Sequence, residues 1–448
     1  NIRVDTYGWD VKRVLPRINE DINEEWISDK TRYACDGLKN QRLDTPYIRD
    51  GDNFKKISWK FAHEQIIKKI NNTMPERIAG FTGDLTNMET LYIIKEFFEK
   101  TIKSKNLESR IDKSYVNIKH RSNYIFNSQI NGIEESDLIV LIGANPRFEA
   151  TILNARIRKN FIKNKTKIYT IGELKDQTYP VINLPNNTST IKEICEDRHA
   201  LSTEINEAKK PIIILGQSAL RIKSSKYIFE NLKKFLFDKN KITDNWNSLN
   251  ILSNNASTVG SYDLDILSSD DGSNLVLDRL YENKFDILFL FGQDNLNFKK
   301  KNEFIIYIGS HGDKGAEIAD LILPGAAYTE QDGHYTNLEG KIQKSYRASY
   351  PPGEAKEDYE IINNLSELIK KKKLFNNKNE LIDSLMNYLK LQTKKFKNEL
   401  ISEKFISEEK VVIDQIDYYY SNVIARASAT MSECRNKKIE LKKTGTEG

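Results

Sequence analysis

The sequence has 448 residues, more than one hydrophobic core usually serves, so we expect two or three packed units. Hydrophobic residues make up 39% and charged residues 30% of the chain, which excludes a disordered polypeptide. The net charge of +5 is the small difference between 69 basic and 64 acidic side chains, so composition gives no indication of a nucleic-acid partner.

Residues 1–57 are predicted to form an N-terminal segment with a hairpin and connecting loops. Ile2, Val4 and Thr6 alternate with charged residues, and Gly8 falls at the expected turn. Ser58 is the predicted N-cap of the amphipathic helix that follows.

Short apolar runs that end in glycine recur four times along the chain. Apolar runs without polar alternation are typical of strands buried on both faces of a parallel sheet. Helices must then cover both faces, which predicts an α/β protein with doubly wound, mainly parallel sheets. The runs are Asp137–Gly143, Ile212–Gly216, Asp286–Gly292 and Phe304–Gly309.

The best-defined helix follows the first of these runs. Asn145 is its predicted N-cap, and Pro146 suits the first helical position. Phe148, Ile152 and Ala155 are spaced to face the sheet, and Arg156 suits the C-terminal end.

These patterns divide the rest of the chain into three parts. Residues 58–208 are predicted to form a first α/β unit and residues 209–365 a second. Residues 366–448 are rich in lysine, and we expect a helical C-terminal extension and tail there, without chemistry.

The chain contains three cysteines, which are far apart and lack the CxxC spacing of metal sites. We interpret Cys35, Cys195 and Cys434 as reduced thiols. The longest apolar runs are far shorter than the roughly 20 residues of a membrane-spanning helix, so no direct membrane insertion is expected.

Three segments of the sequence resemble the molybdopterin oxidoreductase superfamily. The third is the longest and the most specific. They are Arg42-Leu43 with Pro46–Arg49 and Ile57–Trp59; Asp137–Pro146; and Ala319–Ala327 with Glu330, Asp332-Gly333 and Thr336–Gly340.

Within that superfamily, the sequence is most similar to the large iron–sulfur subunits of respiratory complex I, in their mitochondrial-type form. The similarity extends over nearly the whole chain. It is carried by Leu15–Arg17, Glu20–Arg32, Asp36–Leu38, Asn145–Ala150, Asn154–Lys159 and Arg426–Ser428.

This resemblance implies a matrix-side subunit of NADH:ubiquinone oxidoreductase at the mitochondrial inner membrane, or at the cytoplasmic face of a bacterial membrane. In that family an N-terminal portion carries iron–sulfur clusters, and a cluster typically needs four closely spaced thiolates. Three scattered cysteines cannot supply them. We therefore expect no cofactor on this chain, and expect the clusters and the FMN on partner chains or on a cluster-bearing N-terminal portion.

Two functions are compatible with the resemblance. The first is a structural, non-catalytic part of the peripheral arm of complex I, in contact with other peripheral-arm subunits. The second is a fragment of an active molybdopterin-dependent enzyme such as a formate dehydrogenase, in which strand-end crevices would hold a pyranopterin dinucleotide. Arg147, Phe148 and Glu149 are bulky where that cofactor would approach the backbone, and Ser122 and Ser128 are unconvincing metal ligands, so the first function is favoured.

A third candidate, an independent nucleotide-binding module, ranks last because the sequence contains no GxGxxG loop.

The remaining polar candidates are all interpreted as structural, so no catalytic, cofactor-binding or metal-binding residue is predicted. Glu330 and Asp332 are expected to accept bonds from backbone amides at a turn. Arginines are expected in internal bridges or interfaces, and histidines at the surface, in loops or at turns. The arginines are Arg42, Arg49, Arg147 and Arg156, and the histidines are His63, His120, His199, His311 and His334.

Overall fold

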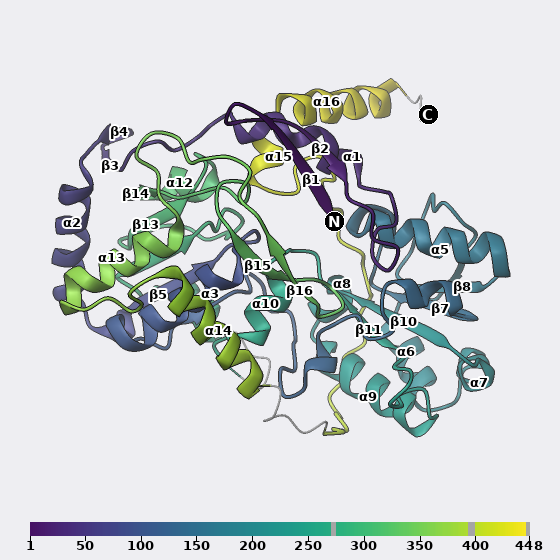
Figure 1. Cartoon of the computed structure of the whole chain (residues 1–448). Helices are drawn as coiled ribbons and strands as arrows, with labels where there is room; N and C mark the ends of the chain where they lie inside the picture. The colour runs from purple at the N-terminus through teal and green to yellow at the C-terminus, as the bar shows by residue number, and fades with distance from the viewer. Residues whose placement is uncertain (270–274, 393–398, 445–448) are drawn as a thin grey trace.

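The computed structural model describes residues 1–269, 275–392 and 399–444, and it contains two large β-sheets flanked by helices (Figure 1). Two separate two-stranded hairpins complete the strands. The predicted α/β class with mainly parallel sheets is confirmed, because eight strand pairs inside the two large sheets are parallel.

The larger sheet has seven strands in the order β4-β3-β14-β13-β12-β5-β6. The five strands from β14 to β6 are parallel, and β3 and β4 form an antiparallel edge. The strands are β3 (Tyr47–Asp50), β4 (Asn53–Lys56), β5 (Ile78–Thr82), β6 (Leu107–Glu108), β12 (Ile287–Phe291), β13 (Phe304–Gly309) and β14 (Leu321–Pro324).

The smaller sheet has five parallel strands in the order β11-β10-β7-β8-β9. Its strands are β7 (Leu138–Ile142), β8 (Lys167–Ile171), β9 (Ile182–Leu184), β10 (Pro211–Gly216) and β11 (Leu249–Leu252). All four glycine-terminated runs of the sequence are therefore strands, two in each large sheet.

The two sheets divide the chain differently from the predicted units. The predicted boundary between residues 208 and 209 falls inside the smaller sheet, because β7 and β10 pair across it. The larger sheet joins β5 to β12, which lies about 200 residues later in the sequence, so the smaller sheet is an insertion between its strands. Strand order of this kind is a long-range property, and local apolar patterns do not encode it.

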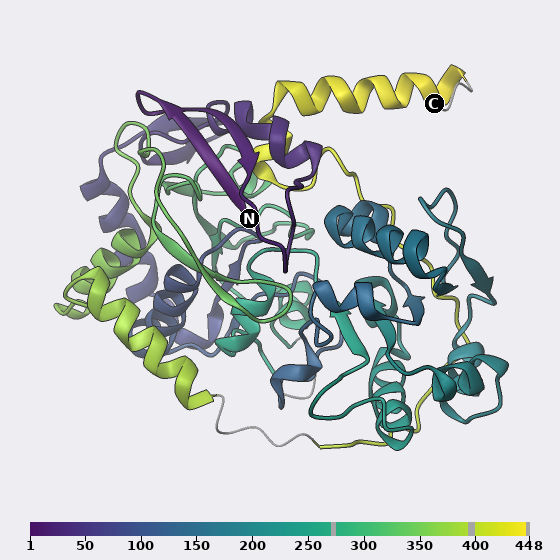
Figure 2. The same ribbon diagram turned by 45° about the vertical axis from the view of Figure 1, so that its right-hand side comes forward.

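Helices cover the sheets and join their strands (Figures 1 and 2). They are α1 (Asp29–Tyr33), η1 (Ala34–Leu38), α2 (Trp59–Asn71), α3 (Met88–Glu96), η3 (Phe97–Ile102), α4 (Pro146–Glu149), α5 (Thr151–Asn164), α6 (Thr188–Cys195), α7 (Ala200–Glu207), α8 (Gln217–Leu220), α9 (Ser225–Asp238), α10 (Thr258–Asp263), α11 (Leu275–Tyr281), α12 (Lys314–Ile318), α13 (Asp358–Lys370), α14 (Lys378–Gln392), α15 (Val423–Ala427) and α16 (Ala429–Thr444).

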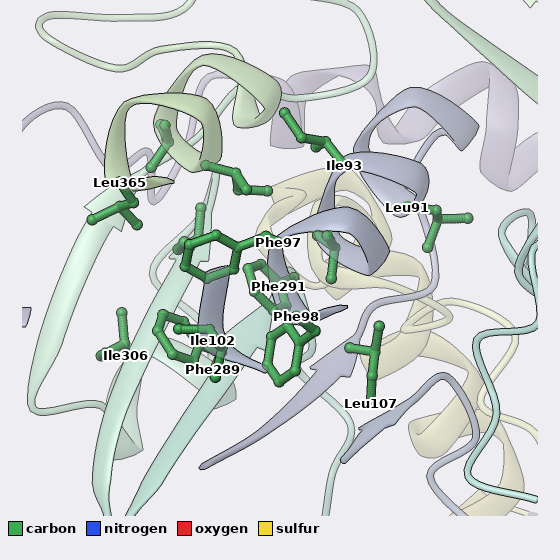
Figure 3. Packing of buried hydrophobic residues seen from close by; sticks show 14 of the residues in the cluster. Leu91, Ile93, Phe97, Phe98, Ile102, Leu107, Phe289, Phe291, Ile306 and Leu365 are labelled. Atoms are coloured by element: carbon green, nitrogen blue, oxygen red, sulfur yellow. The ribbon is translucent and has the colours of Figure 1, made fainter. Parts of the chain in front are cut away.

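A phenylalanine cluster forms the core between the larger sheet and helix α3 with its continuation η3 (Figure 3). Phe97 and Phe98 extend from the helical side toward Phe289 and Phe291 of β12, with ring centroids about 6 Å apart. Each of these rings is almost completely buried, and burying a phenylalanine stabilises a fold by about 1.5–3 kcal/mol. This core fixes the position of the strand ends at which ligands bind in α/β proteins.

The predicted N-terminal hairpin is confirmed as β1 (Ile2–Tyr7) and β2 (Asp10–Pro16), with Gly8 at a positive φ of 58°. The predicted cap of α2 is also confirmed, because the Ser58 hydroxyl accepts a bond of 3.2 Å from the Phe61 amide.

The helix after β7 departs from its prediction. It breaks at Ala150 into α4 and α5, and the Asn145 side chain makes no cap hydrogen bond. The break rotates the buried face, so Ala155 is exposed and Arg156 is buried. The predicted sheet-facing set was therefore wrong at Ala155, and Arg156 is not a solvated residue of the helix end.

The C-terminal part combines helices with an extended stretch. Residues 378–392 form α14, but residues 399–417 contain no helix, and Lys410 makes a single bridge to Asn187. In Figure 2 the yellow trace of this stretch runs along the smaller sheet unit and then rises to α15. We call residues 407–427 the C-terminal strap. No helix among the described residues has the length and apolar character required to cross a bilayer.

Candidate functional site

The carboxyl ends of the parallel strands are where α/β sheets hold ligands, so they are the candidate site of this fold. In the larger sheet these ends carry Gly83, Gly292, Gly309 and Gly325, each at or just after a strand. The cavity at these strand ends, which Gly292 and Gly309 line, has a volume of about 50 Å³. Ligand pockets in proteins measure about 300–1,000 Å³, so this space suits a few water molecules and nothing larger.

Protein atoms occupy the space beside three of these four glycines. A Cβ atom on Gly83 would collide with the carbonyl of Gly292, and one on Gly325 would collide with the carboxylate of Asp358. A Cβ on Gly309 would lie 2.5 Å from the Tyr307 hydroxyl. These glycines therefore serve close packing within the chain.

Three carboxylates line the small cavity, and sequence reasoning did not identify any of them as a site. Burial raises the pKa of Asp294 to about 7 and that of Asp358 to about 7, and it also raises the pKa of Asp84. Asp294 accepts bonds from the Tyr307 hydroxyl (3.0 Å) and the Gly315 amide (3.1 Å).

The C-terminal strap closes this crevice. Asn422, Ile424 and Arg426 line the cavity together with the carboxylates. The Arg426 Nε donates to Asp313 at 2.6 Å, and both side chains are nearly buried. A guanidinium thus lies among carboxylates at the strand ends of the larger sheet, where α/β proteins hold ligands.

The same strap also covers the strand ends of the smaller sheet. The Ile413 side chain lies 2.9 Å from a Cβ built on Gly172, which follows β8. The Val411 amide donates to the Asn186 carbonyl (2.8 Å), and the Asp414 amide donates to the Ser218 hydroxyl (3.0 Å).

The two strand-end crevices therefore do not fit a pyranopterin dinucleotide. One crevice is a cavity of about 50 Å³, and a segment of the chain itself lies across the other. Glu149, which the sequence placed near the cofactor approach, accepts a bond of 2.8 Å from the Asn145 amide, and burial raises its pKa.

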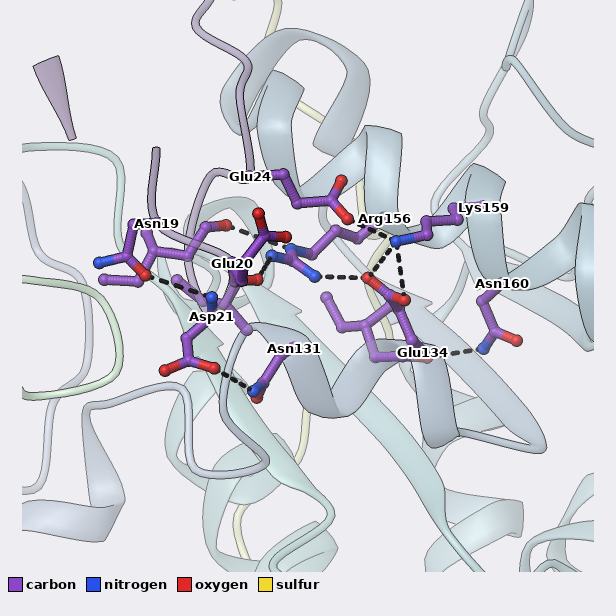
Figure 4. Close-up of polar contacts among 12 residues, drawn as sticks. Asn19, Glu20, Asp21, Glu24, Asn131, Glu134, Arg156, Lys159 and Asn160 are labelled. Carbon is purple, nitrogen blue, oxygen red and sulfur yellow. Dashed lines mark hydrogen bonds and ion pairs between the residues drawn. The ribbon is translucent and has the colours of Figure 1, made fainter. Parts of the chain in front are cut away.

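Two of the four arginines are buried in bridges inside the chain. Arg42 forms a two-point pair with Glu330, with bonds of 2.5 and 2.6 Å. Arg156 pairs with Glu134 and donates to the carbonyls of Glu20 and Ile22 (Figure 4). This network ties the N-terminal segment to α5.

The other two arginines also bond within the chain. Arg49 donates to the Ala319 carbonyl at 2.8 Å. Arg147 pairs with the exposed Asp176 at 2.6 Å. The structure brings none of the four arginines together into one phosphate-binding cluster within its described residues.

Both carboxylates of the predicted turn bond to backbone amides, as predicted. Glu330 accepts from the Ala327 amide at 2.9 Å, and Asp332 accepts from the Arg347 amide at 2.8 Å. Ser128, considered and rejected as a metal ligand, donates to the Asn247 carbonyl at 2.7 Å. Ser122 bonds to the ring of the neighbouring His120.

His311 is completely buried and holds two loops together. Its ring bonds to the Gly37 carbonyl (2.9 Å) and to the Ser310 hydroxyl (2.8 Å). Burial, assisted by Arg42, lowers the pKa of His311 to about 4, so the ring is neutral near pH 7. The expected loop-stabilising role agrees with these contacts. His334 instead bonds to Glu89 at 2.5 Å.

An iron–sulfur cluster needs a set of thiolates, and the chain offers few. Cys35, Cys195 and Cys434 are free thiols that lie far apart in the sequence. In the part of the chain that the structure describes, no group of three or more His, Cys, Asp or Glu residues is arranged to hold a metal ion. A typical cluster has four cysteine ligands, so these residues do not fit one on their own.

Three family models match the chain. The description "Molybdopterin oxidoreductase" matches residues 42–368. An "NADH-ubiquinone oxidoreductase NDSU1/NuoG-like, 4Fe-4S domain" matches residues 1–36, where Cys35 is the one cysteine. A third model, for the C-terminal part of the NuoG-type subunit of NADH-ubiquinone oxidoreductase, matches residues 387–434, which include the whole C-terminal strap. The match at residues 1–36 leaves the absence of a cluster on this chain as a prediction.

Curated relatives are similar over almost the whole chain. The NADH-ubiquinone oxidoreductase 75 kDa subunit of Reclinomonas americana is 39% identical over 97% of this chain and 66% of its own length. An NADH-quinone oxidoreductase subunit of Rickettsia bellii is 39% identical over 99% of this chain and 65% of its own length. The chain therefore spans slightly less than two thirds of the relatives that it matches.

A solved structure has the same fold. Acetylene hydratase from Pelobacter acetylenicus superposes with a TM-score of 0.56 over 97% of this chain and 76% of its own, at 11% sequence identity. Because the first of the family models covers residues 42–368, well over half of the sequence, the chain belongs to the molybdopterin oxidoreductase family.

Proposed function

We propose that the chain is a structural, non-catalytic part of the large peripheral-arm subunit of NADH:ubiquinone oxidoreductase, respiratory complex I. The observation that carries the non-catalytic role is the C-terminal strap, which lies across the strand ends of both sheets. The assignment to complex I is supported by the names of relatives at 38–39% identity and by the NuoG-type C-terminal model over residues 387–434.

In this proposal the chain binds neither pterin nor flavin, and it supports electron transfer by packing against the subunits that carry the redox groups. Its partners are other peripheral-arm subunits, including a cluster-bearing N-terminal portion or separate chain. FMN and the clusters belong to those partners. The proposed location is the matrix side of the mitochondrial inner membrane, supported by the mitochondrial relative from Candida albicans. A bacterial location is the alternative, in line with the Rickettsia relatives.

Affinity purification of the tagged full chain from its native membranes tests the proposal. We expect flavin-bearing and cluster-bearing polypeptides to co-purify with NADH:ubiquinone reductase activity, and an untagged strain provides the control. Elemental analysis of the same sample should find no stoichiometric molybdenum or tungsten. A pterin and one of these metals bound to the chain would instead support an active molybdopterin enzyme, and would contradict the proposal.

Iron is tested separately, because partner chains contribute iron to the intact complex. The full chain is expressed alone, and cluster assembly is attempted with iron and sulfide under reducing conditions. We expect no visible absorption of a protein-bound cluster. A stable cluster that is lost in Cys35→Ser would overturn the cofactor part of the proposal and leave the complex I assignment intact.

A further inference from the structure

A cleft of about 900 Å³ lies between the N-terminal hairpin, the C-terminal strap and the hairpin of β15 (Gly333–Thr336) and β16 (Ile342–Ser345), next to the small cavity of the larger sheet. Figures 1 and 2 both show β1 beside the β15–β16 hairpin, close to the N-terminus. Asn1 bonds to Gln343 at 2.9 Å, and Ser349 bonds to the Trp9 carbonyl. This volume lies within the range of about 300–1,000 Å³ of protein ligand sites.

The two hairpins present different surfaces to the cleft. The consecutive residues 343–348 line it, so β16 presents a backbone edge, whereas the Arg347 and Ala348 amides just beyond β16 already bond to Asp332 and Thr329. Only the alternate residues Ile2, Val4 and Thr6 of β1 line it, so β1 presents one face. Within the residues that the structure describes, β16 pairs with β15 and with no other strand. An unpaired edge is a template for a further strand.

The charge in the cleft has one sign. Arg17, Lys30, Lys344 and Arg347 line it, and none of the described carboxylates does. Arg17, Lys30 and Lys344 form no salt bridge with any described residue, whereas Arg347 has a distant partner, Glu357, at 3.8 Å. Burial lowers the pKa of Lys30, a shift that a carboxylate in the cleft would oppose. The complementary occupant is therefore acidic.

Exposed aromatic side chains flank the same surface. Tyr346 is 66% exposed, and Trp9 is 69% exposed although its ring lies 4.4 Å from that of Tyr350. The Arg347 guanidinium lies over Tyr350 at 4.5 Å. Tryptophan, tyrosine and arginine are the residues that dominate binding at protein interfaces.

We propose that this cleft receives an extended acidic segment of a partner protein, which adds as a strand to the open edge of β16 and packs against the face of β1. Backbone hydrogen bonds to β16 supply the affinity of such strand addition, and side-chain contacts supply the specificity. Lys344, Arg347, Arg17 and Lys30 pair with its carboxylates. The proposal depends on the geometry of the cleft and goes beyond the complex I assignment.

Fluorescence anisotropy of the full chain with a labelled decapeptide of alternating Glu and Val tests the proposal. We expect saturable binding that weakens with salt, and no binding of the matched Lys–Val peptide. Lys344→Glu should weaken binding about tenfold. The matched control is Lys163→Glu, an exposed charge reversal on α5 outside the cleft, which should leave binding unchanged.

Two further measurements separate strand addition from charge attraction. A Glu–Val peptide N-methylated on alternate residues keeps its charge but loses the backbone donors of one edge, so it should bind about tenfold more weakly. Hydrogen exchange should slow at residues 342–346 when the unmodified peptide binds. Equal affinity for the N-methylated peptide, no binding of the Glu–Val peptide, tighter binding of a single-stranded RNA of equal length, or occupation of the cleft by a second copy of the chain would each overturn the proposal.

Discussion

The strand ends of the two sheets are covered by one strap in two chemically different ways. At the larger sheet the cover is polar, because Arg426 pairs with Asp313 beside Asp294 and Asp358. At the smaller sheet the cover is an extended chain held by backbone hydrogen bonds, with the apolar Ile413 against Gly172. In this chain, ion pairing fills the space at one set of strand ends, and an extended segment with an apolar side chain fills it at the other.

The largest expected difference in stability comes from substitutions at two glycines that have the same backbone conformation, one in each crevice. Gly143 and Gly292 have φ values of 59° and 61°, but a Cβ on Gly143 would lie 2.5 Å from the Ala219 amide nitrogen, while no atom lies within 4 Å of one on Gly292. Gly143→Val should destabilise the chain by about 4 kcal/mol through collision and strain. Gly292→Ala should cost about 1–2 kcal/mol, from strain alone. Urea unfolding midpoints measure both, and equal losses would contradict this account of the packing.

Removing the guanidinium tests the polar cover. Arg426→Met leaves Asp313 unpaired and nearly buried, so we expect a loss of about 3 kcal/mol in the free energy of unfolding. The double variant Arg426→Met with Asp313→Asn should recover part of that loss, because no uncompensated charge is left behind. Additive effects of the two substitutions in a double-mutant cycle would show that the pair does not hold the strap.

The polar cover should also depend on pH. The folded pKa of Asp294 is about 7, above the unfolded value of about 3.9, so the folded state binds more protons than the unfolded state between these values. Stability should therefore fall as pH rises from about 4 to 7, by about 1–3 kcal/mol, and then level off. Asp294→Asn should flatten this slope, as should Asp358→Asn. Unfolding midpoints at pH 5 and pH 8 measure the effect, and an unchanged slope in both variants would refute it.

A substitution in the apolar cover of the smaller sheet should have the smallest effect on the free energy of unfolding. Ile413 is half-buried, so Ile413→Ala should cost about 1 kcal/mol, below the range of a fully buried isoleucine. This loss should not vary between pH 5 and pH 8. Hydrogen exchange should quicken at the Val411 and Asp414 amides, while the exchange of α15 stays as in the unmodified chain. Faster exchange at both ends of the strap would mean that the two covers open as one unit.

Much of the fold could be predicted from local sequence. The Gly8 hairpin, the Ser58 cap and the four glycine-terminated strands depend on backbone conformation or burial within a few residues, so they leave local patterns. The division between two sheets could not be predicted, because β5 pairs with β12 across an inserted sheet. The buried face of α5 was not predicted, because the break at Ala150 interrupts the helical periodicity that was counted from Phe148.

The candidate site was the hardest part to predict. The strap lies in residues that the sequence suggested were a helical, lysine-rich extension, because its apolar run Val411–Ile413 is only three residues long and has no helical periodicity. Asp294 and Asp358 are ordinary carboxylates in sequence, and only their burial distinguishes them. Arg426 lies in the segment that carried the family resemblance, which was the one local signal of its importance.

The position of the strap has a consequence for how the chain is made. Residues 411–426 are translated after every strand of the two large sheets, yet they cover the ends of both. A ribosome-bound chain that has completed its sheets still exposes Gly172 and the carboxylates around Asp294 to solvent. The nascent chain therefore cannot close either crevice until residues 411–426 have emerged from the ribosome.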